Sequence, residues 1–268
     1  MSEEASNGRP LPRRVLLGGV PLDAVTRDEA IQRIDELVKR KKGGAVFTPN
    51  VDHIVQVVDN PALRTAYASA DLSLVDGMPV LWASRLLGDG VPEKISGSDL
   101  TMPLLSHAAT EGWRVFLLGG GEGVSLLAAE KLGALLPAIT IAGTLSPRID
   151  MTEPKKSRQA IVDAIRAARP DIVLVALGAP KQELFIHEAR AALEPAVLLG
   201  LGASIDFIAG TASRAPAWMS SVGLEWLYRL VREPRRLWKR YLVRDPRFAL
   251  ILLEEVLARR RRSSRSSS

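Results

Sequence analysis

The stretch Arg114-Val-Phe-Leu-Leu-Gly-Gly-Gly-Glu-Gly123 decides the fold. A short apolar run followed by glycines is typical of a buried strand that ends in a tight turn. The residues after it, up to about Leu136, have the length and pattern of a helix. The segment therefore predicts a strand, a glycine turn and a helix in direct succession.

The same alternation of strand and helix recurs on both sides of this stretch. We predict strands at Val15–Val20, Ala45–Thr48, Leu72–Val75, Ile139–Ala142, Ile172–Leu177 and Ala196–Leu201. We predict helices at Asp28–Arg40, Val51–Val58, Met78–Leu87, Asp99–Thr110, Lys155–Ala168 and Lys181–Leu193. Such alternation indicates an α/β fold, a Rossmann-like and largely parallel sheet with helices on both faces.

The amino-acid composition excludes several kinds of functional site. The 268 residues include no cysteine, which excludes disulfides, thiolate zinc sites and a cysteine nucleophile. The histidines, His53, His107 and His187, are scattered, and no DxD motif occurs. We therefore expect no metal site and no cofactor. The acidic N-terminus does not resemble a signal peptide, and no apolar run reaches the length of a membrane span, so we expect a cytoplasmic protein.

Positive charge is concentrated at the C-terminus. The whole chain has a net charge of +6, yet residues 214–268 alone hold fourteen Lys and Arg against five Asp and Glu. This asymmetry favours an anionic partner, either nucleic acid, a phosphate-bearing ligand or a membrane surface. We expect a disordered leader over residues 1–13, an α/β core over 14–213, a basic helical appendage over 214–258 and a disordered basic and serine-rich tail over 259–268.

Polar side chains stand where predicted strands end. Thr48 and Asn50 follow one strand, and Asp76 follows another. Ligands of open α/β sheets bind at the carboxyl ends of the strands, so these residues are candidates for substrate contact, and Asp76 is a candidate general base. Helix capping by Thr48 and Asn50, and a turn at Asp76-Gly77, are the structural alternatives.

Glycine-rich turns supply candidate phosphate contacts. Gly119, Gly120 and Gly121 precede a predicted helix, and Gly178 precedes another. Glycine lets the backbone approach a phosphate, and helix N-termini favour negative charge. Asp206 follows the last predicted strand. The GxGxxG pattern fails at Val124, which weakens the case for a dinucleotide-binding oxidoreductase. For each glycine, a role in structural packing remains the alternative.

In this order the motifs resemble the WecG/TagA/CpsF glycosyltransferase family. The resemblance covers roughly residues 15–242 and is most specific in Pro180-Lys181-Gln182-Glu183 and Gly223-Leu-Glu-Trp-Leu-Tyr-Arg229. It implies a metal-independent, inverting transfer of an N-acetylmannosamine-type sugar from a UDP donor. The implied acceptor is N-acetylglucosamine on an undecaprenyl diphosphate lipid, at the inner face of the cytoplasmic membrane.

The resemblance also implies residue roles. Asp76 matches the family's proposed general base, and Thr48, Asn50 and Gln182 match its polar active-site residues. Lys94 stands where the family usually has Arg, and it keeps the charge without the bidentate fork. The appendage, with Arg229, Arg236 and Lys239, would close over the site and meet the membrane. A nucleotide-binding oxidoreductase and a nucleic-acid-binding protein stay as alternatives, although no nucleic-acid partner is expected, and a homo-oligomer stays open.

Overall fold

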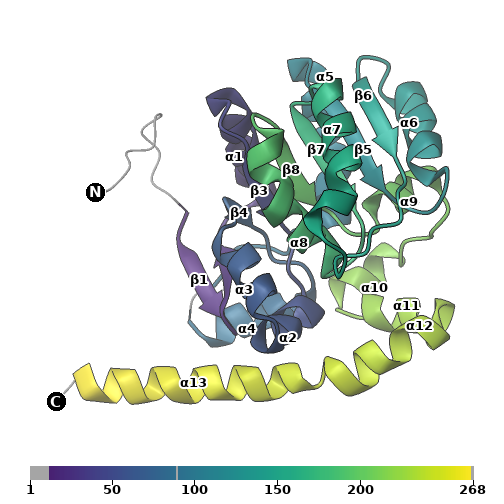
Figure 1. Cartoon of the computed structure of the whole chain (residues 1–268). Coiled ribbons are helices and arrows are strands. Elements are labelled where there is room, and N and C mark those ends of the chain that lie inside the picture. The colour runs from purple at the N-terminus through teal and green to yellow at the C-terminus, as the bar shows by residue number, and fades with distance from the viewer. Residues whose placement is uncertain (1–11, 89, 267–268) are drawn as a thin grey trace.

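A six-stranded sheet forms the centre of the protein (Figure 1). The computed structural model describes residues 12–88 and 90–266. The strands lie in the order β4-β3-β8-β7-β5-β6, and every neighbouring pair is parallel. Their bounds are β3 Gly44–Phe47, β4 Leu72–Ser73, β5 Arg114–Gly119, β6 Thr140–Leu145, β7 Ile172–Ala176 and β8 Val197–Gly200. The predicted parallel α/β fold is confirmed.

Side chains alternate between two hydrophobic cores, one on each face of the sheet. In β5, Val115 and Leu117 enter one core, whereas Phe116 and Leu118 enter the other. This period of two is what a strand covered on both faces requires. The first core is covered by α1 (Arg27–Arg40), α5 (Gly97–Glu111), α6 (Val124–Leu135) and α9 (Ser204–Ala209).

The second core lies under a different set of elements. They are α2 (Val51–Asp59), α3 (Pro61–Ala68), α4 (Met78–Leu86), α7 (Gln159–Ala168), α8 (Lys181–Ala189) and the 3₁₀ turn η2 (Arg190–Leu193). A further 3₁₀ turn, η1 (Lys155–Arg158), precedes α7. An antiparallel hairpin of β1 (Arg14–Leu17) and β2 (Val20–Asp23) packs on the same side. The helices α3 and α9 were not predicted, and β6 extends to Leu145 beyond its predicted end.

Close packing explains one glycine of the deciding stretch. Gly119 has a φ of +114°, and a Cβ atom there would lie 2.2 Å from the carbonyl oxygen of Ala176 in the neighbouring strand. Only glycine avoids this collision with the backbone. The structural alternative therefore accounts for Gly119 without a ligand.

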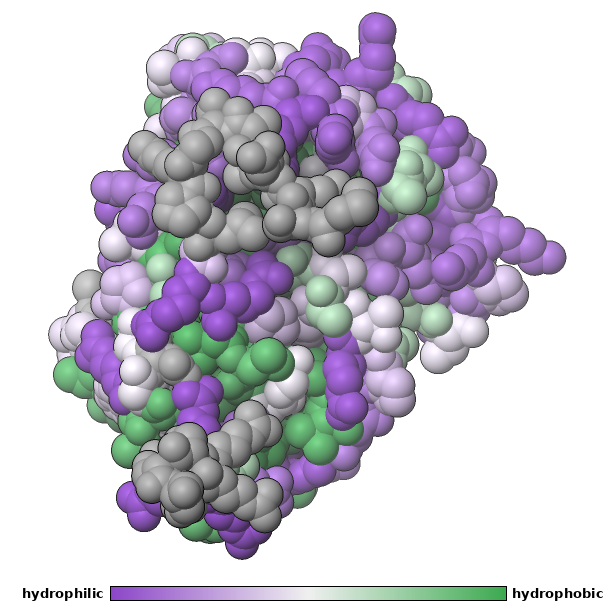
Figure 2. All heavy atoms as spheres, turned by 90° about the vertical axis from the view of Figure 1, so that its left-hand side faces the viewer, coloured by the Kyte–Doolittle hydropathy of each residue, from purple (hydrophilic) through white to green (hydrophobic). Residues whose placement is uncertain are grey.

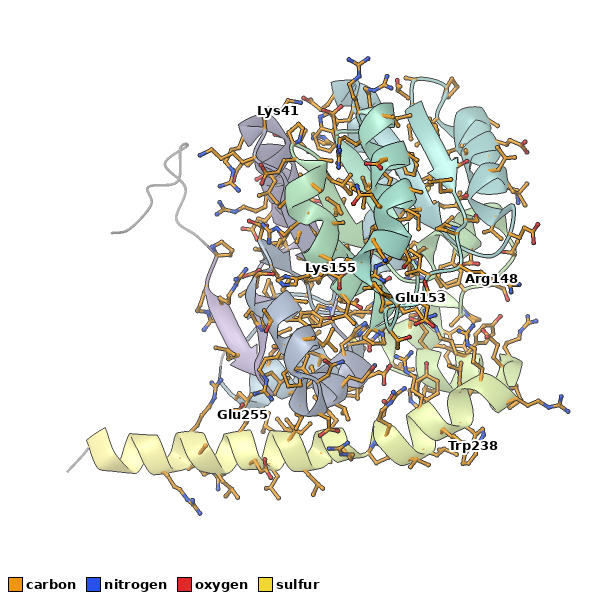
Figure 3. All side chains as sticks on the ribbon, viewed as in Figure 1. Lys41, Arg148, Glu153, Lys155, Trp238 and Glu255 are labelled. Carbon is orange, nitrogen blue, oxygen red and sulfur yellow. The ribbon has the colours of Figure 1, made fainter. Side chains whose placement is uncertain are left out.

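The C-terminal appendage is a chain of helices that leaves the sheet and passes beneath it (Figure 1). It consists of α10 (Ala217–Ser221), α11 (Glu225–Arg232), α12 (Pro234–Lys239), the π-helical turn η3 (Arg240–Arg244) and α13 (Arg247–Ser266). In Figure 3, side chains of α13 project both toward the core and away from it. None of the helices in residues 12–88 and 90–266 is long and apolar enough to span a membrane.

The tail differs from the sequence-based expectation. We expected disorder from Arg259 onward, yet α13 continues as a helix to Ser266. Leu252 and Val256 pack against the core, and Arg259 donates to the carbonyl oxygens of Leu87 and Leu16 at 2.9 and 3.4 Å. These tertiary partners stabilise a helix that composition alone does not indicate. Most of the predicted leader, residues 1–11, lies outside the described residues, as do residues 267–268.

Candidate active site

Polar residues meet in a crevice between the carboxyl ends of β3 and β8. After β3 the chain turns to the face covered by α2, whereas after β8 it turns to the opposite face and forms α9. Such a divergence opens a crevice outside the strand ends. Thr48 lines this crevice and connects the two strand ends, because its hydroxyl donates to the carbonyl oxygen of Gly200 at 3.0 Å.

Asn50 connects three parts of the site. Its side-chain oxygen accepts from the amide of Asp52 at 3.1 Å and so caps α2. The same oxygen accepts from the guanidinium of Arg240 in the appendage at 3.2 Å. Its amide nitrogen lies 3.5 Å from the carboxylate of Asp76. Asn50 therefore caps α2 and also contacts both Asp76 and Arg240.

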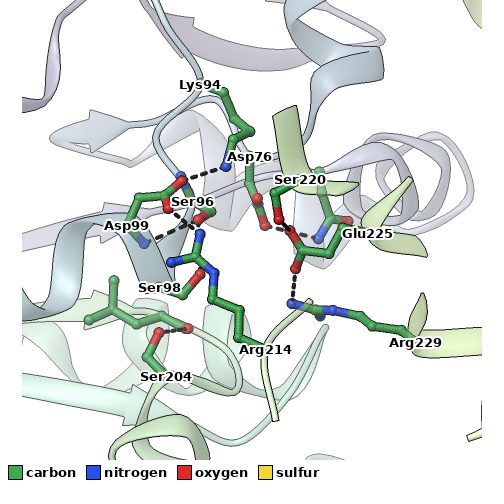
Figure 4. A network of polar contacts seen from close by, with 12 residues as sticks. Asp76, Lys94, Ser96, Ser98, Asp99, Ser204, Arg214, Ser220, Glu225 and Arg229 are labelled. Atoms are coloured by element: carbon green, nitrogen blue, oxygen red, sulfur yellow. Dashed lines mark hydrogen bonds and ion pairs between the residues drawn. The ribbon is translucent and has the colours of Figure 1, made fainter. Parts of the chain in front are cut away.

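Asp76 lies just beyond β4, with its carboxylate in the crevice (Figure 4). Burial raises the pKa of this carboxyl group, and the nearby carboxylate of Glu225 raises the pKa further. Arg229, Lys94 and His53 lower it, but they do not outweigh the burial. A half-buried carboxylate of raised pKa is a stronger base than an exposed one, which suits proton abstraction.

A polar cavity of about 530 Å³ opens above the strand ends. Its walls include Thr48, Asn50, Asp76, Gly120, Gly178, Gln182, Asp206, Arg229, Arg236 and Arg240. Gln182 is buried, and its side-chain oxygen accepts from the amide of Gly202 at 3.2 Å while its nitrogen donates to Glu183 at 2.7 Å. The glycine backbone and cationic side chains fit a phosphorylated ligand.

A second cavity of about 350 Å³ lies on the other side of Asp76. Its walls are mostly apolar and come from α2, α4, the α10–α11 region and the start of α13. Four residues line both cavities and separate them: Asn50, Asp76, Arg229 and Arg240. The carboxylate thus stands at the boundary between a polar and an apolar chamber, where two different substrates can meet.

Arg229 is held in place by its own helix. The guanidinium donates to the carboxylate of Glu225 at 2.5 Å, and Glu225 also accepts from the hydroxyl of Ser220 at 3.1 Å (Figure 4). Arg229 and Glu225 are one helical turn apart, so both reach the apolar cavity from the same face of α11, and Arg229 also lines the polar cavity. Phe207 packs against the guanidinium, with its ring centre 5.8 Å away.

A second charged cluster joins the appendage to α5. Asp99 accepts from Lys94 and from Arg214, and its carboxylate completes a capping box with Ser96 at the start of α5. Burial acts to raise the pKa of Asp99, but the hydrogen bonds from Lys94, Arg214 and Ser96 outweigh it and bring the pKa to about 2. Lys94 also lines the apolar cavity, so this pairing fixes a cation at its rim.

Asp52 ties the appendage to α2 beneath the site. Its buried carboxylate lies 3.4 Å from the guanidinium of Arg240 and 2.7 Å from that of Arg244. Nearby, the buried pair His53 and Glu183 lies at 3.3 Å. Asp52 therefore fixes Arg240 and Arg244, and the cationic wall of the site is assembled only when the appendage is seated.

The structure brings together most of the predicted site residues. Thr48, Asn50, Asp76, Gln182, Gly120, Gly178, Asp206, Arg229 and Arg236 line the polar cavity, and Lys94 lines the apolar one. Gly119 and Gly121 line neither, and Lys239 lies 5.6 Å from the ring centre of Trp238 instead. Assignment of roles to these residues remains a prediction.

Sequence reasoning missed Glu225, Arg240 and Asp52. Glu225 stands inside the specific string that ends at Arg229, so its signal was visible but unassigned. Arg240 is one of many basic residues, and nothing in the sequence marks it as the one that reaches Asn50. Within the part of the chain that the structure describes, no group of three or more His, Cys, Asp or Glu side chains could hold a metal ion.

Comparison with known proteins identifies the class. A model of the glycosyl transferase WecG/TagA/CpsF family matches residues 15–262. Two similar relatives are N-acetylglucosaminyldiphosphoundecaprenol N-acetyl-beta-D-mannosaminyltransferases. The protein from Bacillus spizizenii is 36% identical over 203 residues, 76% of either chain. The protein from Bacillus subtilis is 35% identical over 218 residues, 81% of this chain and 82% of its own.

The parallel sheet, the crevice at its strand ends and this match define a glycosyltransferase. The family model spans the core and nearly all of the appendage, so both parts are covered by the match. The chain belongs to the WecG/TagA/CpsF family. The predicted resemblance is confirmed, and it favours a transferase over the oxidoreductase and nucleic-acid-binding alternatives.

Proposed function

We propose that this enzyme transfers an N-acetylmannosamine-type sugar from a UDP donor to N-acetylglucosamine on an undecaprenyl diphosphate lipid. The names of the two Bacillus relatives support both the sugar and the acceptor. The single observation that carries the chemistry is the place of Asp76, at the boundary between a polar and an apolar cavity. The donor would occupy the polar cavity, and the acceptor would approach from the apolar one.

In this mechanism Asp76 acts as the general base. Its carboxylate takes the proton from the acceptor hydroxyl as the oxygen attacks the anomeric carbon, and the bond to UDP breaks with inversion. General-base assistance accelerates such reactions by roughly 10²–10⁴-fold. The raised pKa of Asp76 fits the role, because the carboxylate holds a proton more readily than an exposed aspartate does.

Cationic side chains take the charge of the leaving diphosphate. Arg229, Arg236 and Arg240 line the polar cavity and are aimed from the appendage. Fixed cations near developing negative charge stabilise the transition state most where water is excluded. We propose that these side chains do so without a metal ion. At Gly120 and Gly178 the absence of a side chain would let the diphosphate come close to the protein backbone.

The appendage would hold the enzyme at the inner face of the cytoplasmic membrane. On α13, Leu250, Leu253 and Leu257 share one face at helical spacing and are 63%, 53% and 43% exposed. The opposite face packs on the core, so α13 is apolar on two sides. The sequence after Arg259 is rich in arginine, and an arginine near an anionic surface contributes roughly 1 kcal/mol. These features support peripheral binding by an interfacial helix.

The test is a panel of UDP-sugars offered with a water-soluble N-acetylglucosamine diphosphate lipid analogue. We expect UDP release to be fastest with UDP-N-acetylmannosamine, and EDTA to leave the rate unchanged. Release with no sugar of the panel, or loss of the rate in EDTA that added divalent metal restores, would contradict the proposal.

A further inference from the structure

The apolar cavity beside Asp76 opens onto an exposed apolar stripe that the transfer chemistry does not use. Met78 and Pro79 at the start of α4 line the cavity. Trp82 and Leu86 follow Met78 at intervals of four residues, so they continue the same helix face away from the cavity. Trp82 is 48% exposed and Leu86 is 67% exposed.

A matching stripe starts from the same cavity on α13. Ala249 lines the cavity, and Leu253 and Val256 follow at positions i+4 and i+7. The other flank of α13 faces α2, because Arg247 pairs with Asp59 at 2.6 Å. Val256 packs against the same core cluster as Val80 of α4, and the neighbouring Leu253 is exposed.

The two helices are joined at their far ends. The guanidinium of Arg259 donates to the carbonyl oxygen of Leu87, directly after α4, at 2.9 Å. Both helices thus begin at the cavity and meet again one residue past Leu86. Figure 2 shows apolar side chains gathered on the lower part of the face from which α13 is seen end-on, while the upper part is mostly hydrophilic.

Charge changes along this path in one direction. At its inner end the cavity is lined by Lys94, Arg229 and Arg240, beside Asp76. Beyond Met78 the path is formed by hydrocarbon and indole. A molecule that fits has a diphosphate at one end and a long apolar chain at the other, with its reacting hydroxyl close to Asp76.

We propose that the stripe formed by Trp82, Leu86, Ala249, Leu253 and Val256 is a binding track for the polyprenyl chain of the acceptor. The inference rests on the proposed function and adds a location to it: the diphosphate sits among the cations of the apolar cavity, and the first isoprene units lie between α4 and α13. The track orients the acceptor before transfer, so chain length affects binding and not only membrane partition.

The experiment uses the full-length enzyme without vesicles or detergent. The probes are N-acetylglucosamine diphosphates that carry one to four isoprene units, with UDP-N-acetylmannosamine as donor. For the wild type we expect kcat/KM to rise with chain length. In the double variant Trp82→Gln/Leu86→Gln the ratio of kcat/KM for the longest over the shortest probe should fall at least tenfold, which corresponds to about 1.4 kcal/mol.

The matched control is Leu126→Gln/Leu135→Gln on α6, where both leucines are exposed but lie on a helix of the other sheet face. It should keep the wild-type ratio, and thermal unfolding should confirm that both variants fold. Failure of the proposed function would give a different result from failure of the track, because the wild type would then use none of the probes, whatever their chain length.

Three results would overturn the track. One is a wild-type rate that does not depend on chain length. Another is a stripe variant that loses vesicle binding but keeps its chain-length ratio, which makes the stripe a membrane contact only. The third is a variant whose ratio is unchanged but whose sedimentation mass falls, which makes the stripe an interface between two copies of this chain.

Discussion

The sheet core and the C-terminal appendage are held together by different forces. Every residue of β3, β7 and β8 is buried, and both faces of the sheet are covered by helices. From Trp218 to Arg261, among the described side chains, only Leu237 and Phe248 are buried. The appendage meets the rest of the chain through charged contacts at Asp99, Asp52 and Asp59. Its apolar contacts with the core are fewer and come mainly from α13, through Phe248, Leu252 and Val256.

This difference teaches how the site is assembled. Burial of apolar area stabilises the core by roughly 25 cal/mol per Å², a contribution that salt does not screen. Exposed ion pairs contribute about 0–1 kcal/mol each and weaken as salt rises. We therefore expect the core to fold without the appendage, whereas the cationic side chains of the polar cavity, Arg229, Arg236 and Arg240, belong to the appendage and require it to be in place.

The largest expected effect comes from the core side of the site. Asp76→Asn should lower kcat by roughly 10²–10⁴-fold, because the amide cannot accept the hydroxyl proton. Thermal stability should stay the same or rise, since a half-buried charge is removed. Activity and unfolding curves are measured together. Asp163→Asn, an exposed surface change, is the control, and near-normal turnover by folded Asp76→Asn would exclude the base role.

Loosening the appendage should have the next largest effect. In Asp52→Asn the guanidinium groups of Arg240 and Arg244 lose their buried carboxylate. The cost should be below the about 3–5 kcal/mol of a fully buried pair, because Arg244 is 42% exposed. We expect activity to fall at least tenfold and proteolysis after residue 213 to speed up while the core resists.

The matched control for that variant is Asp59→Asn, which removes the exposed pair with Arg247. It should change activity and proteolysis little. Equal behaviour of the two variants would show that Asp52 does not hold the appendage.

A smaller effect is expected on the pH dependence of activity, because a charge in the appendage acts on the carboxylate in the core. Glu225 in the appendage raises the pKa of Asp76 in the core. Asp76 must be ionised to act, so kcat/KM should rise as pH increases through this raised pKa. In Glu225→Gln the pKa of Asp76 falls, so the acid limb of the pH profile should move to lower pH. Ser220→Ala keeps the charge of Glu225 and should leave the acid limb in place. An acid limb that does not move in Glu225→Gln would show that Glu225 does not influence the pKa of Asp76.

The smallest effect should appear at Asp99. Its folded pKa of about 2 lies below the ordinary value of 3.8, so the contribution to stability is complete above about pH 4 and is lost as pH falls toward 2. Partial exposure limits it to about 1–2 kcal/mol. Unfolding of wild type and Asp99→Asn should therefore differ most at neutral pH and converge near pH 2. A constant difference would refute the linkage.

Sequence patterns predicted the core well because the required signals are local. The apolar run from Val115 to Leu118, the glycine turn after it and the polar residues after β3 and β4 follow from periodicity and turn chemistry alone. The prediction missed α3 despite the local start signal Asn60-Pro61, and it ended α13 too early because the continuation of that helix depends on tertiary packing. No element was predicted between Val58 and Leu72, where α3 begins at Pro61, and the helix from Arg247 continues through a basic tail because it packs on the core.

By itself the sequence determined the parallel α/β class, the strand-end position of Asp76 and the family, since strings such as Gly223-Leu-Glu-Trp-Leu-Tyr-Arg229 need no coordinates. Only the tertiary structure decided that Arg240 reaches Asn50, that Glu225 lies near Asp76, and that Arg259 of α13 meets Leu87 at the end of α4. Those relations join residues up to 190 positions apart. Contacts at such separations depend on how helices pack, and no local pattern in the chain encodes them.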